Sequence, residues 1–176
     1  MLQKGLIISS ENECLIKDNI DFIVIRAGYT DYNLSKTKYK DKDFDKNYKY
    51  AKDNNLKIGV YYETRATSQI EAIDEIDFFI NIIENTEIDY PILLKVLDDH
   101  NTIIYYPENQ ITIDKNVFNN IINIMYNKLK IYNYLPVLIT NKYLKNKLFN
   151  YNSYNIIDEE MIIDDILYID IDKLLK

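Results

Sequence analysis

The fold is decided by Phe22-Ile-Val-Ile-Arg26, a short run of apolar and mostly β-branched residues. A continuous run of this kind predicts a strand that is covered on both faces, as in a parallel sheet. Working outward from it, we predict further strands at residues 6–9, 57–62, 92–97, 135–139 and 166–170. The chain therefore carries the strands of a largely buried sheet.

Helical patterns lie between these strands. Residues 43–54, 115–130 and 141–149 carry apolar positions at helical spacing, and Ser68-Gln-Ile-Glu71 is a capping box that opens another helix. Alternation of strands and helices is typical of parallel β/α units. We expect one domain over residues 1–176 with an α/β fold, an irregular β/α barrel. Active sites of such barrels lie at the C-terminal ends of the strands.

Composition and charge exclude several classes of function. With 47% hydrophobic residues in 176, the chain can bury one sizeable core, and it has no apolar run of about 18 residues that would span a membrane. The net charge of −7 argues against nucleic acid or an anionic membrane as the main partner. Ile, Asn, Tyr and Lys dominate, and their A/T-rich codons indicate a low-GC genome.

The start of the chain and its single cysteine bear on compartment. Met1-Leu-Gln-Lys-Gly5 leads directly into a strand pattern and lacks the features of a signal peptide, so we expect synthesis in the cytoplasm. Cys14 has no partner for an internal disulfide, which suits a reducing compartment, and we expect a small, partly buried side chain there.

Six segments stand out in order along nearly the whole chain. They are Lys4-Gly-Leu-Ile-Ile-Ser-Ser10, Asp21-Phe-Ile-Val-Ile-Arg-Ala-Gly-Tyr29, Asp43-Phe-Asp-Lys-Asn47, Leu56-Lys-Ile-Gly-Val-Tyr-Tyr62, Leu138-Ile-Thr-Asn141 and Tyr168-Ile-Asp-Ile-Asp172. In sequence, order and spacing they resemble the family 25 glycoside hydrolases, the lysozyme-like muramidases of bacteria, phages and some fungi. The resemblance implies an irregular TIM-like β/α barrel.

The departures from the family fall where its chemistry would be. The family carries carboxylates at the positions of Ile7, Lys95 and Leu97, and a tyrosine at that of Ile139. Of the acidic cluster only Asp170 is retained, and the chain has no tryptophan. Sugar hydrolysis needs a proton donor and a second carboxylate. The resemblance therefore implies a muramidase-like domain without catalytic residues.

The alternation of side chains along the strand at 92–97 predicts how the open end of the barrel is rearranged. Residues 93, 95 and 97 share one face of their strand. We expect Leu97 and Ile7 to pack together there with apolar surface. Because Asp170 would then be a carboxylate beside hydrocarbon, we predict that Lys95 pairs with it.

The acids after the fourth strand are weak replacements for the lost pair. A shift of one residue turns a side chain to the other face, so Asp98 cannot replace a glutamate at 97, and Asp99 would need a bulge. His100, the only histidine, is expected to be a solvated loop residue. We predict no metal site, and the chain has no motif for a cofactor.

Several side chains are candidates for binding a glycan instead. Tyr29 and Tyr62 are retained at family aromatic positions, while Glu63 and Arg65 follow the third strand as a rim ion pair or as sugar ligands. In the segment 102–107, Tyr105 and Tyr106 either stack on sugar rings or fill the old cleft. The candidate glycan-binding residues are Tyr29, Tyr62, Arg65, Asp98 and Tyr105.

Three functions remain open from the sequence. The first is an inactive structural or protein-interaction module of a phage or phage-tail-like assembly, located in such a particle or released by lysis. The second is a non-hydrolytic module that binds peptidoglycan glycan. The third is an active muramidase that uses Asp98 or Asp99 with Asp170. An open cleft would favour binding, and a cleft filled by Leu97, Ile7 and Tyr105 would favour a scaffold.

Overall fold

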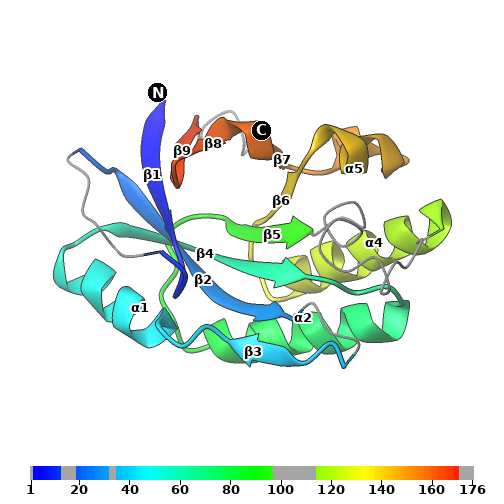
Figure 1. Cartoon of the computed structure of the whole chain (residues 1–176), viewed down its shortest axis with the longest axis horizontal. Helices are drawn as coiled ribbons and strands as arrows, with labels where there is room; N and C mark the ends of the chain where they lie inside the picture. The colour runs from blue at the N-terminus through cyan, green and yellow to red at the C-terminus, as the bar shows by residue number, and fades with distance from the viewer. Residues whose placement is uncertain (1, 13–18, 32–34, 97–113, 171–176) are drawn as a thin grey trace.

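A computed structural model describes residues 2–12, 19–31, 35–96 and 114–170 (Figure 1). Its strands are β1 (Gln3–Ile8), β2 (Phe22–Thr30), β3 (Lys38–Lys40), β4 (Lys57–Thr64), β5 (Ile92–Val96), β6 (Pro136–Thr140), β7 (Ile156–Asp158), β8 (Ile162–Ile163) and β9 (Ile166–Ile169). Its helices are α1 (Phe44–Asp53), α2 (Gln69–Ile83), α4 (Lys115–Ile131) and α5 (Lys142–Lys147), with 3-10 turns η2 (Tyr151–Ser153) and η3 (Glu159–Met161).

All the described strands belong to one sheet, in the order β7-β6-β5-β4-β2-β1-β9-β8, with β3 paired to β2 off this path. The strands from β7 to β1 are parallel, as the continuous apolar runs predict. The last strands reverse this direction, because β9 runs antiparallel to β1 and β8 antiparallel to β9. The chain thus extends its sheet beyond β1 with its C-terminal strands β9 and β8.

Side-chain alternation divides the core into two clusters. One contains Ile157 of β7 together with Leu167 of β9, which lie near opposite ends of the strand order, so the sheet curls into a nearly closed barrel. This interior cluster consists of Ile7, Phe22, Val24, Tyr61, Leu93, Val137, Ile139, Ile157, Leu167 and Ile169. The second cluster fills the space between the outer face of the sheet and helices α1, α2 and α4 (Figure 1).

Helices α2 and α4 begin at residues whose side chains cap the first backbone N–H groups. Ser68 Oγ accepts the Glu71 N–H at 3.2 Å at the start of α2, and Asp114 accepts from Asn116 N at 2.7 Å at the start of α4. The buried face of α2 is Ala72, Ile76, Phe79, Ile80 and Ile83. None of the described helices is long and apolar enough to cross a membrane.

The sequence expectations for the fold are confirmed in the main, with additions at the C-terminal end. The irregular barrel of β/α type is observed, and the helix predicted over 43–54 is α1. The tail was expected to give one strand, but the structure adds β7 and β8 before β9. These are strands of three and two residues, too short to carry a period-2 pattern of their own.

Candidate functional site

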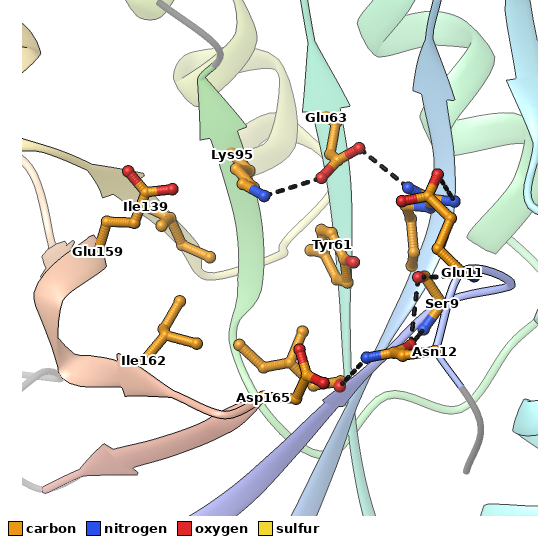
Figure 2. A pocket seen from close by; sticks show the side chains of 12 residues that line it. Ser9, Glu11, Asn12, Tyr61, Glu63, Lys95, Ile139, Glu159, Ile162 and Asp165 are labelled. Carbon is orange, nitrogen blue, oxygen red and sulfur yellow. Dashed lines mark hydrogen bonds and ion pairs between the residues drawn. The ribbon is translucent and has the colours of Figure 1, made fainter. Parts of the chain in front are cut away.

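A pocket of about 420 Å³ opens at the carboxyl ends of the parallel strands, where sites of β/α barrels lie (Figure 2). One wall comes from β1 and the loop after it, and the floor comes from β2, β4, β5 and β6. The opposite wall comes from η3, β8 and the turn before β9. Its lining residues are Ile7, Ser9, Glu11, Asn12, Arg26, Tyr61, Glu63, Lys95, Ile139, Glu159, Ile162 and Asp165.

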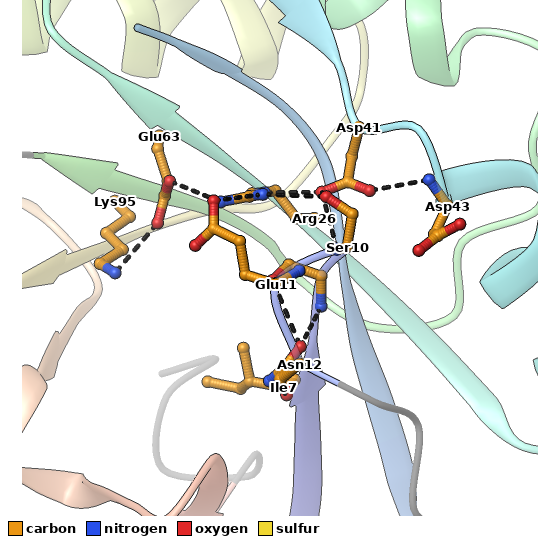
Figure 3. A network of polar contacts seen from close by, with 10 residues as sticks. Ile7, Ser10, Glu11, Asn12, Arg26, Asp41, Asp43, Glu63 and Lys95 are labelled. Atoms are coloured by element: carbon orange, nitrogen blue, oxygen red, sulfur yellow. Dashed lines mark hydrogen bonds and ion pairs between the residues drawn. The ribbon is translucent and has the colours of Figure 1, made fainter. Parts of the chain in front are cut away.

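Arg26 is the centre of the polar side of this pocket. Its side chain is only 3% exposed, and a buried guanidinium needs carboxylate partners. Nε donates to Asp41 Oδ2 at 2.7 Å, Nη1 to Glu63 Oε2 at 3.1 Å and Nη2 to Glu11 Oε1 at 2.9 Å (Figure 3). Three carboxylates from three parts of the chain therefore converge on one cation.

Glu63 links this cation to a second one. Its Oε1 accepts from Lys95 Nζ at 3.0 Å, while its Oε2 accepts from Arg26. Glu63 and Lys95 are register partners on the adjacent strands β4 and β5, which places their side chains on the same face. The result is a row of alternating charge, Lys95–Glu63–Arg26–Asp41, that crosses three neighbouring strands.

Burial and partners set the titration of these groups. Burial alone would lower the pKa of Arg26, but hydrogen bonds to Glu11 and Asp41 and the charge of Glu63 raise it above its ordinary value. Burial would raise the pKa of Asp41, yet the N–H groups of Ser10 and Asp43 and the Arg26 guanidinium bring it below 3.8. Both groups are therefore held charged at neutral pH.

Tyr61 is the aromatic side chain among the described lining residues of the pocket. Burial, reinforced by the negative charge of Glu63, raises its pKa above the ordinary value, so its hydroxyl keeps its proton. It lies on β4 two residues before Glu63, on the same inward face.

The loop after β1 is a compact turn closed by its own side chains. Ser9 N donates to Asn12 Oδ1 at 2.6 Å, and Glu11 N donates to Ser9 Oγ at 3.1 Å. Asn12 Nδ2 in turn donates to the carbonyl of Ile7 at 3.1 Å. These bonds hold the Glu11 side chain over Arg26 (Figure 3).

Of the family acid positions, Ile7 and Lys95 line this pocket, whereas Asp170 is not among its lining residues. Ile7 is 8% exposed, belongs to the interior cluster and lines the pocket, as do Lys95 and Ile139. The described partner of Lys95 is Glu63, and the pair with Asp170 stays a prediction. The expectations for Leu97, Asp98, Asp99, His100, Tyr105 and Tyr106 lie outside the described residues.

One candidate glycan ligand, Tyr62, lies outside the pocket. Tyr62 is fully buried on the helix side of β4, stacked on Phe79 with ring centroids 5.3 Å apart, and its hydroxyl lies 2.9 Å from Thr30 Oγ1. Neighbouring residues of a strand point to opposite faces, so Tyr61 takes the pocket position instead. Because the two tyrosines are adjacent, the sequence alone does not show which of them faces the pocket.

Tyr29 and Arg65 lie outside the set of lining residues. The Tyr29 ring lies under the Arg26 guanidinium, 4.6 Å from its Cζ, and stacks on Tyr39. Tyr29 therefore stabilises the Arg26 guanidinium through a cation–π contact. Arg65 donates its backbone N–H to the buried Glu75 at 3.2 Å. The expected rim pair involves Glu63, but with Arg26 and Lys95 as its cations.

Sequence reasoning missed Arg26 and Glu11 as site residues. Arg26 ends an otherwise apolar run and is one of two arginines in the chain. A cation on a strand that is buried on both faces requires acids nearby, and that was the available signal. No sequence signal was available for Glu11, because the sequence around an acidic loop residue does not indicate a partner that is distant along the chain.

The barrel and the position of its pocket define a β/α-barrel domain. The chain matches the model of glycosyl hydrolases family 25 over residues 17–159, well over half its length, and it belongs to that family. This confirms the resemblance seen in the sequence segments. A search of curated proteins finds no match.

Solved structures of the same fold are more distant. The modular autolysin LytC of Streptococcus pneumoniae, in complex with a synthetic peptidoglycan ligand, gives a TM-score of 0.66 at 21% identity over 82% of this chain and 34% of its own. The Clostridium perfringens spore cortex lytic enzyme SleM gives 0.69 at 14%, over 89% and 52%.

The catalytic domain of endolysin ply40, from bacteriophage P40 of Listeria monocytogenes, gives a TM-score of 0.59 at 12% identity, over 83% of this chain and 66% of its own. The chain thus spans between about a third and two thirds of these proteins. At such identities the likeness shows the fold.

Proposed function

We propose that this domain binds a peptidoglycan-type glycan in the pocket and does not cleave it. The observation that carries the proposal is the character of the pocket at the family acid positions. Ile7 and Lys95 stand there in place of carboxylates, yet the described walls leave about 420 Å³ open. An apolar plug would argue for a scaffold, whereas an open polar pocket is what a ligand requires.

The described carboxylates are poorly arranged for hydrolysis. A glycosidase needs one carboxyl that donates a proton and a second about 5–9.5 Å away. Glu63 accepts from a cation through each of its oxygens, and Glu11 accepts from Arg26, so both serve as acceptors rather than as donors. Glu159 and Asp165 are exposed at the rim, without the shielding that general acids use.

The same groups suit a saccharide. Sugar hydroxyls and acetamido groups both donate and accept hydrogen bonds, and the pocket offers both kinds of partner. Ser9 and Asn12 contribute a hydroxyl and an amide, and Lys95 contributes a donor that is 30% exposed. A pocket of this volume falls within the range of about 300–1,000 Å³ that is usual for small-ligand sites.

The experiment is incubation with purified Gram-positive peptidoglycan, followed by assays for soluble reducing sugar and for protein in the pellet. We expect protein in the pellet and no sugar release above a heat-denatured control. Lys95→Met should weaken retention. Lys57→Met, the same change at the exposed amino end of β4, should leave retention unchanged. Sugar release would overturn the non-hydrolytic assignment and favour an active muramidase that uses Asp98 or Asp99 with Asp170.

A structural or protein-interaction module, in a phage or phage-tail-like assembly, is the second candidate. It is favoured by apolar side chains that β8, β9 and η3 leave exposed, namely Met161, Ile163 and Tyr168. If the assays show no sugar release and no protein in the pellet, the glycan-binding proposal is overturned and this module is favoured. Co-purification with other proteins of a particle would then identify its partner.

A further inference from the structure

The three carboxylates around Arg26 differ sharply in their exposure. The Asp41 side chain is 0% exposed and that of Glu63 is 12% exposed, so both belong to the interior. The Glu11 side chain is 73% exposed, although its carboxylate lies 2.9 Å from a guanidinium that is 3% exposed. A buried cation therefore has one partner that reaches it from solvent.

This asymmetry makes the Glu11 contact exchangeable. A carboxylate that is already largely hydrated loses little when it swings back into water, since exposed ion pairs contribute little free energy. The Nη2 group of Arg26, by contrast, stays buried and would lose its charged acceptor. The position of the Glu11 carboxylate is therefore one that some anion should occupy, while Glu11 itself is replaceable.

The charge around the pocket favours exchange over simple addition. Among the described residues, four acids and two bases line the pocket, so an additional carboxylate would meet net negative charge from them. An anion that replaces the Glu11 carboxylate leaves the number of carboxylates on Arg26 unchanged. Lys95, on the other side of Glu63, adds a second cation facing the same space (Figure 3).

We propose that Arg26 binds a carboxylate of the ligand in the place of Glu11, so that the pocket selects an acidic glycan with a free carboxylate. This inference rests on the proposed function and names its ligand class. In peptidoglycan terms, the class is a strand whose muramic acid carboxylates no longer carry peptides. Glu11 then acts as an internal competitor that occupies the carboxylate position on Arg26 when no ligand is bound.

The test is calorimetric titration with three tetrasaccharides. One alternates N-acetylglucosamine and N-acetylmuramic acid with free carboxylates, the second is the same compound with those carboxylates converted to methylamides, and the third contains N-acetylglucosamine alone. We expect the free acid to bind about tenfold more tightly than the other two, since a charged acceptor strengthens a hydrogen bond from Arg. Equal affinity for the acid and its methylamide would overturn the inference.

Two variants separate exchange from a general effect of charge. Glu11→Gln should raise the affinity for the free acid several-fold and leave that for the neutral sugars unchanged. Glu159→Gln removes an exposed acid from the same pocket without touching the Arg26 contacts, and should have a much smaller effect. An equal gain from both variants, or a loss of affinity in Glu11→Gln, would contradict the exchange.

The inference and the proposed function fail in different ways. Retention of the protein on peptidoglycan without preference for the free acid would overturn the inference alone. Absence of retention, together with absence of binding to all three tetrasaccharides, would overturn both. Far-UV circular dichroism of each variant confirms that it is folded before titration.

Discussion

Arg26 couples the stability of the barrel to the pocket, because it pairs with two carboxylates of the interior, Asp41 and Glu63. Asp41 is 1% exposed and Glu63 is 9% exposed. Replacing Arg26 with methionine keeps most of the apolar volume and removes the charge. We expect the free energy of unfolding to fall by about 3–5 kcal/mol, as when one partner of a buried pair is lost.

Urea denaturation followed by circular dichroism measures this change. Lys49→Met is the control, since Lys49 and Asp53 form an exposed pair on α1 and its loss should cost less than about 0.5 kcal/mol. Similar losses in the two variants would show that the charges around Arg26 are solvated.

Two buried carboxylates should give stability opposite dependences on pH. The pKa of Asp41 is lowered by N–H donors and Arg26 in spite of burial, so its contribution is present above 3.8 and is lost as pH falls through the folded value. Burial raises the pKa of Glu75, with hydrogen bonds from Thr64 and Thr30 countering only part of the effect. Its contribution is present below 4.5 and is lost as pH rises through the folded value.

The prediction compares Asp41→Asn with Glu75→Gln in urea titrations that run from well below pH 3.8 up to pH 8. Asp41→Asn should be clearly destabilised at pH 7, and the deficit should shrink as pH approaches the acid limit. Glu75→Gln keeps an oxygen for the Thr64 hydroxyl, so relative to wild type it should gain stability as pH rises. Parallel pH profiles for the two variants would contradict these assignments.

At the scale of elements, the capping box at α2 was predicted from the sequence and is confirmed in its first half. Ser68 Oγ accepts the Glu71 N–H, but Glu71 Oε2 accepts from Thr67 N at 2.6 Å, one residue before the capping residue. Ser68→Ala should reduce the free energy of unfolding by about 1 kcal/mol, while Ser68→Asp should retain it. Urea denaturation of both variants is the measurement, and equal losses would show that the side-chain acceptor is unimportant.

The long elements could be predicted because each carries its own pattern. The apolar runs gave β2, β4, β5 and β6, and helical spacing gave α1 and α4 within a few residues. The short strands could not, since β3, β7 and β8 are strands only through the neighbours to which they pair. Local sequence contains no record of such tertiary pairing.

The site was predictable in place but not in its contacts. Alternation along β5 predicts Lys95 at the mouth, and Lys95 is one of the residues that line the pocket. Its contact with Glu63 depends on the register between β4 and β5, and that of Glu63 with Arg26 on the order of β2 and β4. The sequence of a single strand determines neither its register nor its place in the strand order. A difference of one residue along β4 also decides that Tyr61, and not Tyr62, faces the pocket.

At the scale of the whole molecule, β9 pairs with β1 and so joins the two ends of the described chain in one sheet. Leu167 points into the interior cluster and is 1% exposed, whereas its neighbour Tyr168 points outward and is 40% exposed. Leu167→Asp would place an unpaired carboxylate among apolar side chains, at a cost of several kcal/mol. Tyr168→Asp changes only the outer surface.

We therefore expect Leu167→Asp to unfold at a much lower temperature than wild type and to lose retention on peptidoglycan, because β1 and the loop carrying Glu11 depend on β9 for their position. Tyr168→Asp should melt within a few degrees of wild type and keep retention. Thermal melts followed by circular dichroism, paired with the pellet assay, test both. If Leu167→Asp melted like Tyr168→Asp and still bound, the pocket would be held by the parallel strands alone, and the antiparallel pairing of β9 with β1 would be dispensable.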